Sequence, residues 1–179
     1  PENVIDYQNI IKSDIQMVLD ECIQYPESYE NVKKSMELSL RWAERSRKHY
    51  NKNKSKIYGA QFGIVQGGVF EDLRKTSISE TVNFDFEGYA IGGLAVGEGH
   101  EKMIEVVDYT APQLPEDKVR YLMGVGKPND IIEAVYRGVD IFDCVIPTRE
   151  GRHGIAYVGS SSINIKNSKF ESDLTPLDE

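Results

Sequence analysis

The 179-residue sequence has no apolar run near the ~20 residues that a membrane-spanning helix requires, and no charged-then-apolar leader opens it. We therefore expect a soluble protein that works in the cytoplasm. Cysteine is also scarce. Cys22 and Cys144 each lie in a strand-like run, outside any Cys-x-x-Cys pair and away from histidine. This pattern predicts reduced intracellular thiols and no metal ion bound by this chain.

Positive charge is in short supply, with 21 Lys and Arg against 29 Asp and Glu and a net charge of -8. Because Lys and Arg supply the affinity for a phosphate backbone, this balance argues against general nucleic-acid binding. Several basic residues nevertheless gather late in the chain, at Arg149, Arg152, His153, Lys166 and Lys169. A local basic patch there is expected.

The most informative stretch runs from Gly138 to Arg149. Its first part is apolar and β-branched or aromatic, which predicts a buried strand, and Asp143 lies in its second half. Pro147 predicts that the strand ends in a Pro-Thr-Arg turn. An acid at the end of such a strand is typical of the active-site rim of a (β/α) barrel. The alternative is that Asp143 merely caps a turn.

Similar runs alternate with helical patterns along the whole chain. The five runs fall within residues 13–22, 61–68, 88–98, 118–126 and 138–149, and the four helices within 29–51, 70–82, 101–109 and 130–137, the last N-capped near Asn129 or Asp130. Alternation of this kind predicts a parallel sheet whose strands all end at one edge. The residues expected to share that rim are Asp20, Gln66, Gly93, Met123 and Asp143.

A doubly wound open sheet would give the same alternation. It is disfavoured because no Gly-x-Gly-x-x-Gly loop follows a strand in the required way, and because polar residues end every strand rather than one switch point. Five βα units are too few to close a barrel of eight. We therefore predict one partial TIM-barrel domain over residues 1–179, in which an incomplete (β/α)8 barrel of five βα units is followed by a small β-hairpin within 154–165.

Two carboxylates on one rim suit glycosidic chemistry, in which a carboxylate stabilises and then bonds a cationic anomeric carbon. Asp143 and Asp20 are the candidates. Gln66 offers a donor and an acceptor, glycine at Gly93 allows close approach of a planar ligand, and Met123 offers a polarizable surface. Together they indicate a site for a purine-like base, against the alternatives of an unspecified barrel enzyme or a plain core.

Five motifs carry a family resemblance: SDIQMVLDEC, FGIVQGG, GYAIGGLAVGE, RYLMGVG and GVDIFDCVIPTREGR. In this order and spacing the chain resembles the bacterial tRNA-guanine transglycosylases over essentially its whole length. The resemblance implies a (β/α)8 barrel with a zinc-bearing insertion. It also implies exchange of the wobble guanine of certain tRNAs for a 7-deazaguanine precursor of queuosine.

The resemblance assigns roles by position. Asp143 matches the covalent nucleophile that attacks C1′ of the ribose, and Glu98 matches the acid that holds the Gly93–Leu94 peptide. Val96 matches the bacterial pattern and implies 7-aminomethyl-7-deazaguanine as the incoming base. The residues implied to read or pack on the base are Asp20, Cys22, Gln66, Gly93, Leu94, Tyr121 and Met123, and those near the anticodon phosphates are Arg149 and Arg152.

Parts of the family pattern have no counterpart in this chain. The first strands, with a second catalytic aspartate, would precede Pro1, and the zinc ligands would follow Glu179. The chain thus resembles the middle and later half of an enzyme that binds tRNA and the precursor base and forms a homodimer when full length. As an isolated fragment it is expected to be inactive and poorly stable. A noncatalytic tRNA-binding or partner subunit, and a glycoside-hydrolase-like barrel enzyme, are the alternatives.

Overall fold

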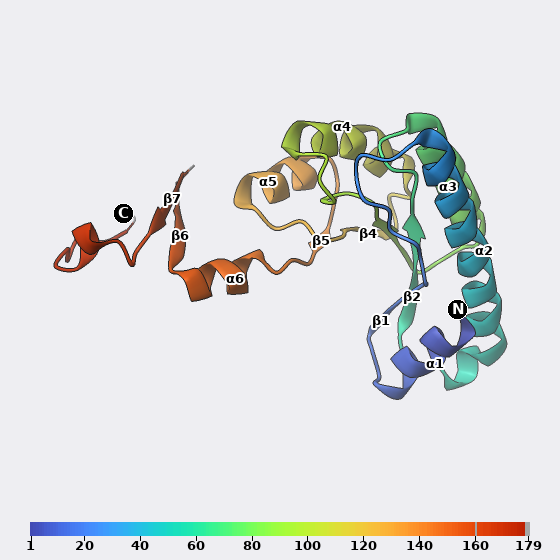
Figure 1. Ribbon diagram of the computed structural model, residues 1–179. Coiled ribbons are helices and arrows are strands. Elements are labelled where there is room, and N and C mark those ends of the chain that lie inside the picture. Colours follow the sequence, from blue (N-terminus) through green and yellow to red (C-terminus); the bar gives the residue numbers. More distant parts are fainter. Residues whose placement is uncertain (160, 178–179) are drawn as a thin grey trace.

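The computed structural model describes residues 1–159 and 161–177, and its main body is a curled parallel sheet that forms part of a barrel (Figure 1). The strand order β1-β2-β3-β4-β5 follows the sequence, and every neighbouring pair is parallel. This arrangement confirms the predicted incomplete TIM barrel. The strands are β1 (Ile15–Met17), β2 (Ala60–Val65), β3 (Gly88–Ile91), β4 (Val119–Leu122) and β5 (Ile141–Phe142).

Helices connect the strands and lie along the outside of the curled sheet (Figure 1). Helix α2 begins after Ser28, whose hydroxyl accepts a hydrogen bond from the Asn31 amide at 3.4 Å. The helices of the main body are α1 (Glu2–Ile10), α2 (Tyr29–Asn53), α3 (Glu71–Asn83), α4 (His100–Thr110) and α5 (Pro128–Tyr136), with 3₁₀ turns η1 (Lys54–Lys56) and η2 (Ala111–Gln113). The four predicted helices are confirmed within a few residues.

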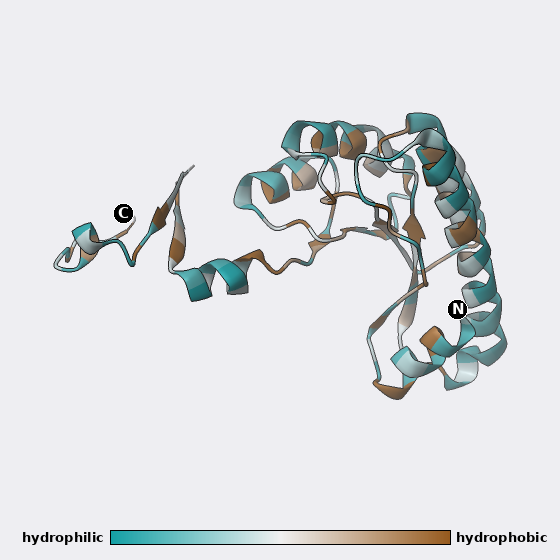
Figure 2. Ribbon diagram, in the orientation of Figure 1, coloured by the Kyte–Doolittle hydropathy of each residue, from teal (hydrophilic) through white to brown (hydrophobic). Residues whose placement is uncertain are grey.

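The central strands form the core because both of their faces are covered. Val65 and Ile91 are register partners on β2 and β3, and Leu122 is the register partner of Ile91 on β4. All three side chains are 0% exposed, and burial of each contributes roughly 1.5–3 kcal/mol. Figure 2 shows the apolar residues gathered in these strands and on the helix faces that meet them. A rigid sheet therefore carries the loops that follow its strands.

The structure corrects the prediction for the stretch that contains Asp143. Only Ile141 and Phe142 are β-strand, both are half-buried, and Asp143 follows them directly. The expected Pro-Thr-Arg turn is instead the first turn of helix α6 (Ile146–His153). Pro147 fits there because the first turn of a helix needs no amide donor from it.

Two smaller predictions are corrected for similar reasons. Strand β1 ends at Met17, so Cys22 lies in the exposed loop that follows rather than in a strand. Helix α5 begins after Lys127, with Pro128 in its first turn, and neither Asn129 nor Asp130 is the N-cap. Proline presets the backbone angle of the first helical residue, and this preference places the start of the helix earlier than the polar residues suggested.

The last part of the chain projects away from the main body (Figure 1). Helix α6 ends at His153 and is capped by Gly154, whose φ of 78° places it in the left-handed region. The antiparallel strands β6 (Ile155–Val158) and β7 (Ser161–Asn164) then form the predicted hairpin, before the 3₁₀ turn η3 (Ser168–Phe170). The predicted turn includes Ser160, which lies outside the described residues. Across the two described ranges, no helix has the length and apolar character needed to cross a membrane.

Candidate functional site

Asp143 lies where β5 ends, and two donors hold one of its carboxylate oxygens. The Tyr121 hydroxyl donates to Oδ1 at 2.6 Å, and the Gly124 amide donates to the same atom at 2.9 Å. Gly124 has a φ of 74°, a conformation that glycine adopts without strain. Within the described residues, no hydrogen bond reaches Oδ2. The carboxylate is thus oriented by its neighbours while one oxygen stays available.

Tyr121 has a second role beside the one predicted from the resemblance. Burial raises the pKa of its phenol, and donation to the Asp143 carboxylate raises it further. The hydroxyl therefore stays protonated and remains a donor across the physiological range. Its side chain ties the end of β5 to β4, the neighbouring strand.

A second carboxylate lies at the opposite end of the sheet order, after β1. The Gln66 side-chain amide donates to Asp20 Oδ2 at 2.6 Å, and Gln66 itself is fixed by its backbone amide, which donates to the Ser77 hydroxyl at 3.0 Å. Burial raises the pKa of the Asp20 carboxyl, although the bond from Gln66 opposes the rise. The structure thus joins two of the predicted site residues directly.

The loop after β3 approaches Gln66 so closely that it requires glycine. A Cβ atom placed on Gly93 would lie 2.3 Å from Gln66 Oε1, and one on Gly92 would lie 2.7 Å from Gln66 Nε2. Gly93 also has a φ of 67°. Its neighbour Leu94 is 4% exposed with its side chain in the core, so only the Leu94 backbone can serve a ligand.

Glu98 holds this loop at a different peptide from the one expected. Its carboxylate accepts hydrogen bonds from the Ala95 amide at 2.5 Å and from the Val96 amide at 2.9 Å. The peptide it orients is therefore Leu94–Ala95 rather than Gly93–Leu94. The physical reason is the reversal of the chain at Ala95, whose φ is 58°. Since a trans peptide directs its N–H and C=O oppositely, the Leu94 carbonyl points away from Glu98.

Sequence reasoning missed Arg74, although it belongs to this group. Its side chain is 0% exposed on the inner face of α3. The guanidinium donates to the carbonyls of Gly68 at 2.8 Å, Val65 at 3.1 Å and Gly93 at 3.4 Å. Burial lowers its pKa to about 10. The sequence signal was weak: Arg74 is next to Leu73 and one turn before Ile78, both of which are buried.

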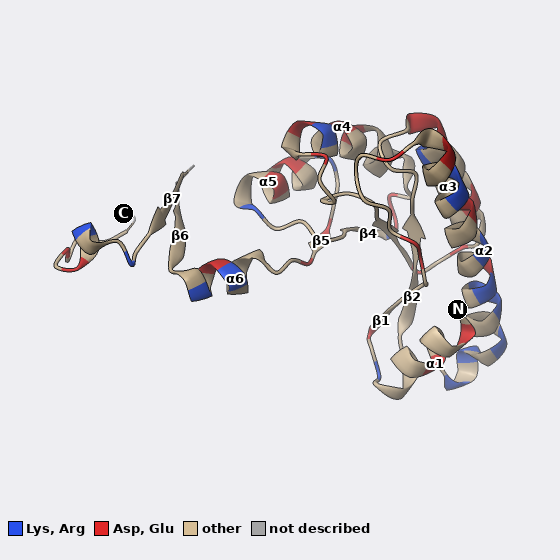
Figure 3. Cartoon of the chain, viewed as in Figure 1, with Lys and Arg blue, Asp and Glu red and all other residues tan. Residues whose placement is uncertain are grey.

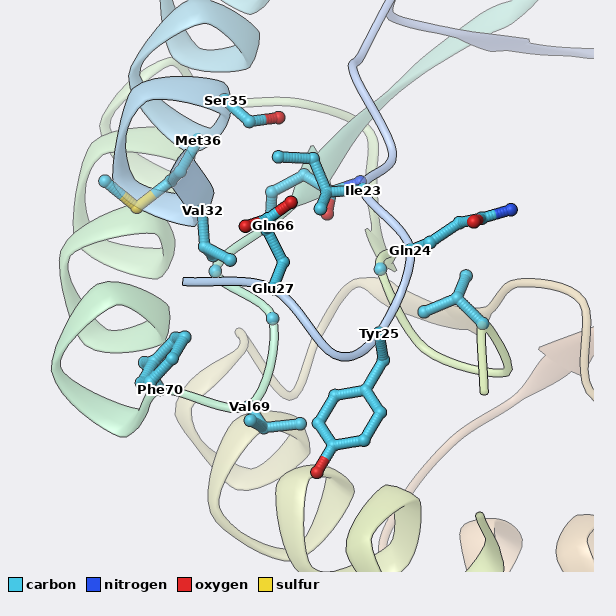
Figure 4. A pocket seen from close by; sticks show the side chains of 14 residues that line it. Ile23, Gln24, Tyr25, Glu27, Val32, Ser35, Met36, Gln66, Val69 and Phe70 are labelled. Atoms are coloured by element: carbon cyan, nitrogen blue, oxygen red, sulfur yellow. The ribbon is translucent and has the colours of Figure 1, made fainter. Parts of the chain in front are cut away.

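A small cavity lies on one side of Gln66, as Figure 4 shows. Its volume is about 30 Å³, and its walls come from the loop after β1, from α2, and from the loops after β2 and β3. Val32 and Met36 of α2 face it together with Tyr25 and Val69 from the loops. Cys22 is an exposed residue of the same loop as Tyr25. Partial desolvation of its thiol and the nearby Asp20 charge raise the Cys22 pKa.

An open groove of about 390 Å³ runs along the loops after β3, β4 and β5. Glu98, Cys144 and Arg149 are among its lining residues. Arg149 and Arg152 are both exposed on α6, where Figure 3 shows basic residues, but only Arg149 lines the groove. Met123 is half-buried against the core at the end of β4. Within residues 1–159 and 161–177, no three His, Cys, Asp or Glu side chains group as a metal site.

The strand ends therefore bring the predicted residues to one edge in connected pairs. Asp20 contacts Gln66, Gln66 abuts Gly93, and Tyr121 contacts Asp143. The fold and site define a barrel-type α/β protein with carboxylates at its strand ends, a class that includes enzymes acting on glycosidic bonds.

Comparison with known proteins gives the family. Residues 1–179 match the family model described as queuine tRNA-ribosyltransferase. The chain is 54% identical over 177 residues to the queuine tRNA-ribosyltransferase of Photobacterium profundum, covering 99% of this chain and 47% of that protein. It is 52% identical over 178 residues to those of Pasteurella multocida and Haemophilus influenzae, covering 99% of this chain and 46% of each relative.

The chain belongs to the queuine tRNA-ribosyltransferase family. It spans about half the length of the curated relatives it matches.

Proposed function

We propose that the full-length protein containing this chain exchanges the wobble guanine of tRNA for 7-aminomethyl-7-deazaguanine, with Asp143 as the covalent nucleophile. The observation that carries the proposal is the orientation of Asp143 by Tyr121 and Gly124 on the rim that also holds the Asp20–Gln66 pair. The relatives bear the name queuine tRNA-ribosyltransferase, which agrees with this chemistry.

The exchange consists of two displacements at C1′ of the ribose. In the first, a carboxylate oxygen of Asp143 bonds to C1′ while the bond from C1′ to N9 of guanine breaks, and the electron pair leaves with the base. Backbone amides of the loop after β3 stabilise that charge. In the second, N9 of the incoming base bonds to C1′ and displaces Asp143. Guanine gains one proton and the incoming base loses one, so the exchange needs no oxidant.

The loop after β3 supports the choice of incoming base. Because Glu98 accepts from the Ala95 amide, the Leu94 carbonyl is directed oppositely and is an acceptor suited to a cationic aminomethyl group. Val96 lines the cavity beside Gln66 and limits the space for a larger substituent. We also propose that Arg149 and Arg152 contact the anticodon phosphates, since both are exposed basic residues on α6.

Trapping of the protein–RNA adduct tests the nucleophile. Full-length protein with Asp143→Asn, incubated with tRNA, forms no adduct that survives denaturation, because a neutral amide is a poor nucleophile. The matched control is Asp140→Asn. Among the described residues, this exposed carboxylate accepts one hydrogen bond, from the Arg120 amide at 2.8 Å, and the variant forms the adduct normally. An adduct that persists in Asp143→Asn moves the nucleophile elsewhere, and absence of guanine exchange by the wild type favours a noncatalytic tRNA-binding or partner subunit.

Three further properties are part of the proposal. The full-length protein binds zinc through ligands beyond Glu179, acts as a homodimer and works in the cytoplasm, where tRNA is modified. Elemental analysis tests the first point: one zinc per full-length polypeptide is expected, and a metal-free preparation with full exchange activity contradicts it. Sedimentation of the same preparation measures its oligomeric state.

A further inference from the structure

Arg74 is a fully buried cation that has only backbone partners. Within the described residues, no carboxylate lies within ion-pairing distance of its guanidinium. Burying an arginine without a counter-ion costs free energy, which hydrogen bonds to its N–H groups offset only in part. The carbonyls that it contacts all belong to two strand ends, those of β2 and β3. Arg74 therefore connects the ends of β2 and β3, where the candidate site lies.

The guanidinium fastens the two loops that form the base site. It contacts Val65 and Gly68 on either side of Gln66, and with a third N–H it contacts Gly93 across the site. Gln66 and Gly93 touch each other so closely that a Cβ has no room between them. Movement of either loop would therefore change the position of the Gln66 amide relative to Gly93.

Arg74 also orients the peptide that faces a bound base. Its N–H donates to the Gly93 carbonyl, so the Leu94 amide of the same trans peptide points in the opposite direction. Within the described part of the chain, the Leu94 amide has no hydrogen-bond acceptor. A cation on the carbonyl side polarises the peptide and makes its N–H a better donor to negative charge.

We propose that Arg74 is the positioning residue for the departing purine: it fixes the Gly93–Leu94 peptide and Gln66 relative to each other and strengthens the amide donors that meet the purine anion. This inference rests on the proposed base exchange. Arg74 itself touches no reacting atom, and it acts through the Gly93–Leu94 peptide and the Gln66 loop. Loss of the Arg74 charge should therefore raise the KM for the base more than the KM for tRNA.

Exchange of labelled guanine into tRNA by the full-length protein tests the inference. Arg74→Lys keeps the charge but cannot span the three carbonyls, so we expect the KM for the base to rise about tenfold while the KM for tRNA stays within about twofold. Arg74→Ala loses more activity, and millimolar guanidinium restores part of it by filling the vacated space.

The matched control is Arg47→Lys. Arg47 is also buried and contacts backbone carbonyls, at Phe84 and Asp85, but these precede β3 at the other end of the sheet. Its substitution lowers the melting temperature and leaves the KM for the base unchanged. If Arg74→Ala does not fold, Arg74→Lys with a wild-type-like circular dichroism spectrum carries the test.

The outcomes separate the two proposals. Absence of exchange by the wild type refutes the proposed function. A wild type that exchanges guanine, with a folded Arg74→Lys whose KM for the base and kcat are unchanged, refutes the role of Arg74 alone. An equal rise in the KM for the base in Arg47→Lys also refutes it, because the effect would then come from general loosening of the fold.

Discussion

Replacement of Tyr121 by phenylalanine isolates one of the two hydrogen bonds that orient Asp143. The variant keeps the aromatic ring and removes only the hydroxyl that donates to Oδ1 at 2.6 Å. Hydrogen bonds to charged groups contribute about 1.5–3 kcal/mol. Because Asp143 is exposed and keeps the bond from the Gly124 amide, we take the lower end. About 1.5 kcal/mol corresponds to a loss of roughly tenfold in the rate of attack.

The assay is the single-turnover formation of the protein–RNA adduct by the full-length protein. We expect Tyr121→Phe to slow adduct formation about tenfold without weakening tRNA binding, since the lost contact is to the nucleophile. The control is Tyr136→Phe, which removes the hydroxyl of a tyrosine that is 87% exposed on α5 and leaves the rate unchanged. An adduct rate in Tyr121→Phe that equals the wild-type rate would show that the hydroxyl does not position Asp143.

Three more predictions concern the site and the sheet. Burial raises the pKa of Asp20, so the protonated carboxyl favours the folded state in acid, and this contribution to stability is lost as pH rises through the folded-state pKa. Asp20→Asn should therefore raise the melting temperature more at neutral pH than in mild acid. An equal gain in melting temperature at both pH values contradicts this. Gly93→Ala should weaken base binding at least about tenfold, because the new methyl group meets Gln66 Oε1 and strains the backbone. Calorimetry with guanine measures the loss of affinity. An unchanged affinity would disprove the close approach of Gly93 to Gln66. The 179-residue chain expressed alone should self-associate, because β1 and β5 are edge strands of the described sheet, each unpaired on one side, and Ile10, Ile11 and Tyr136 are 72%, 73% and 87% exposed. Light scattering measures the self-association. A monomer with a sharp, high-temperature melt contradicts the prediction.

The alternation of apolar runs and helical patterns was enough to predict the parallel sheet and the shared rim. Periodicity reports burial, and burial of β2 and β3 on both faces leaves nearly unbroken apolar segments. Polar residues directly after such segments must lie at the carboxyl edge. This is why the sequence alone predicts that Asp20, Gln66 and Asp143 share that edge.

Other features depend on backbone angles and long-range contacts that periodicity does not report. The peptide held by Glu98 is set by the left-handed conformation of Ala95, which a non-glycine residue gives no sign of in the sequence. Arg74 reads as a solvated helix charge until the carbonyls of two separate loops are seen around it. Pro147 predicts a break equally well for a turn and for the start of α6.

The two carboxylates occupy the outermost positions of the sheet, since Asp20 follows β1 and Asp143 follows β5. The distance between the two carboxylates therefore depends on the angle between each pair of neighbouring strands, and small changes in these angles add up to a larger change in that distance. Each carboxylate is hydrogen-bonded to a residue of the next strand inward or of the loop that follows it, Asp20 to Gln66 after β2 and Asp143 to Tyr121 on β4. A nucleoside that engaged both carboxylates would span all the strands between them, so that ligand binding and the curvature of this part of the sheet become one mechanical variable.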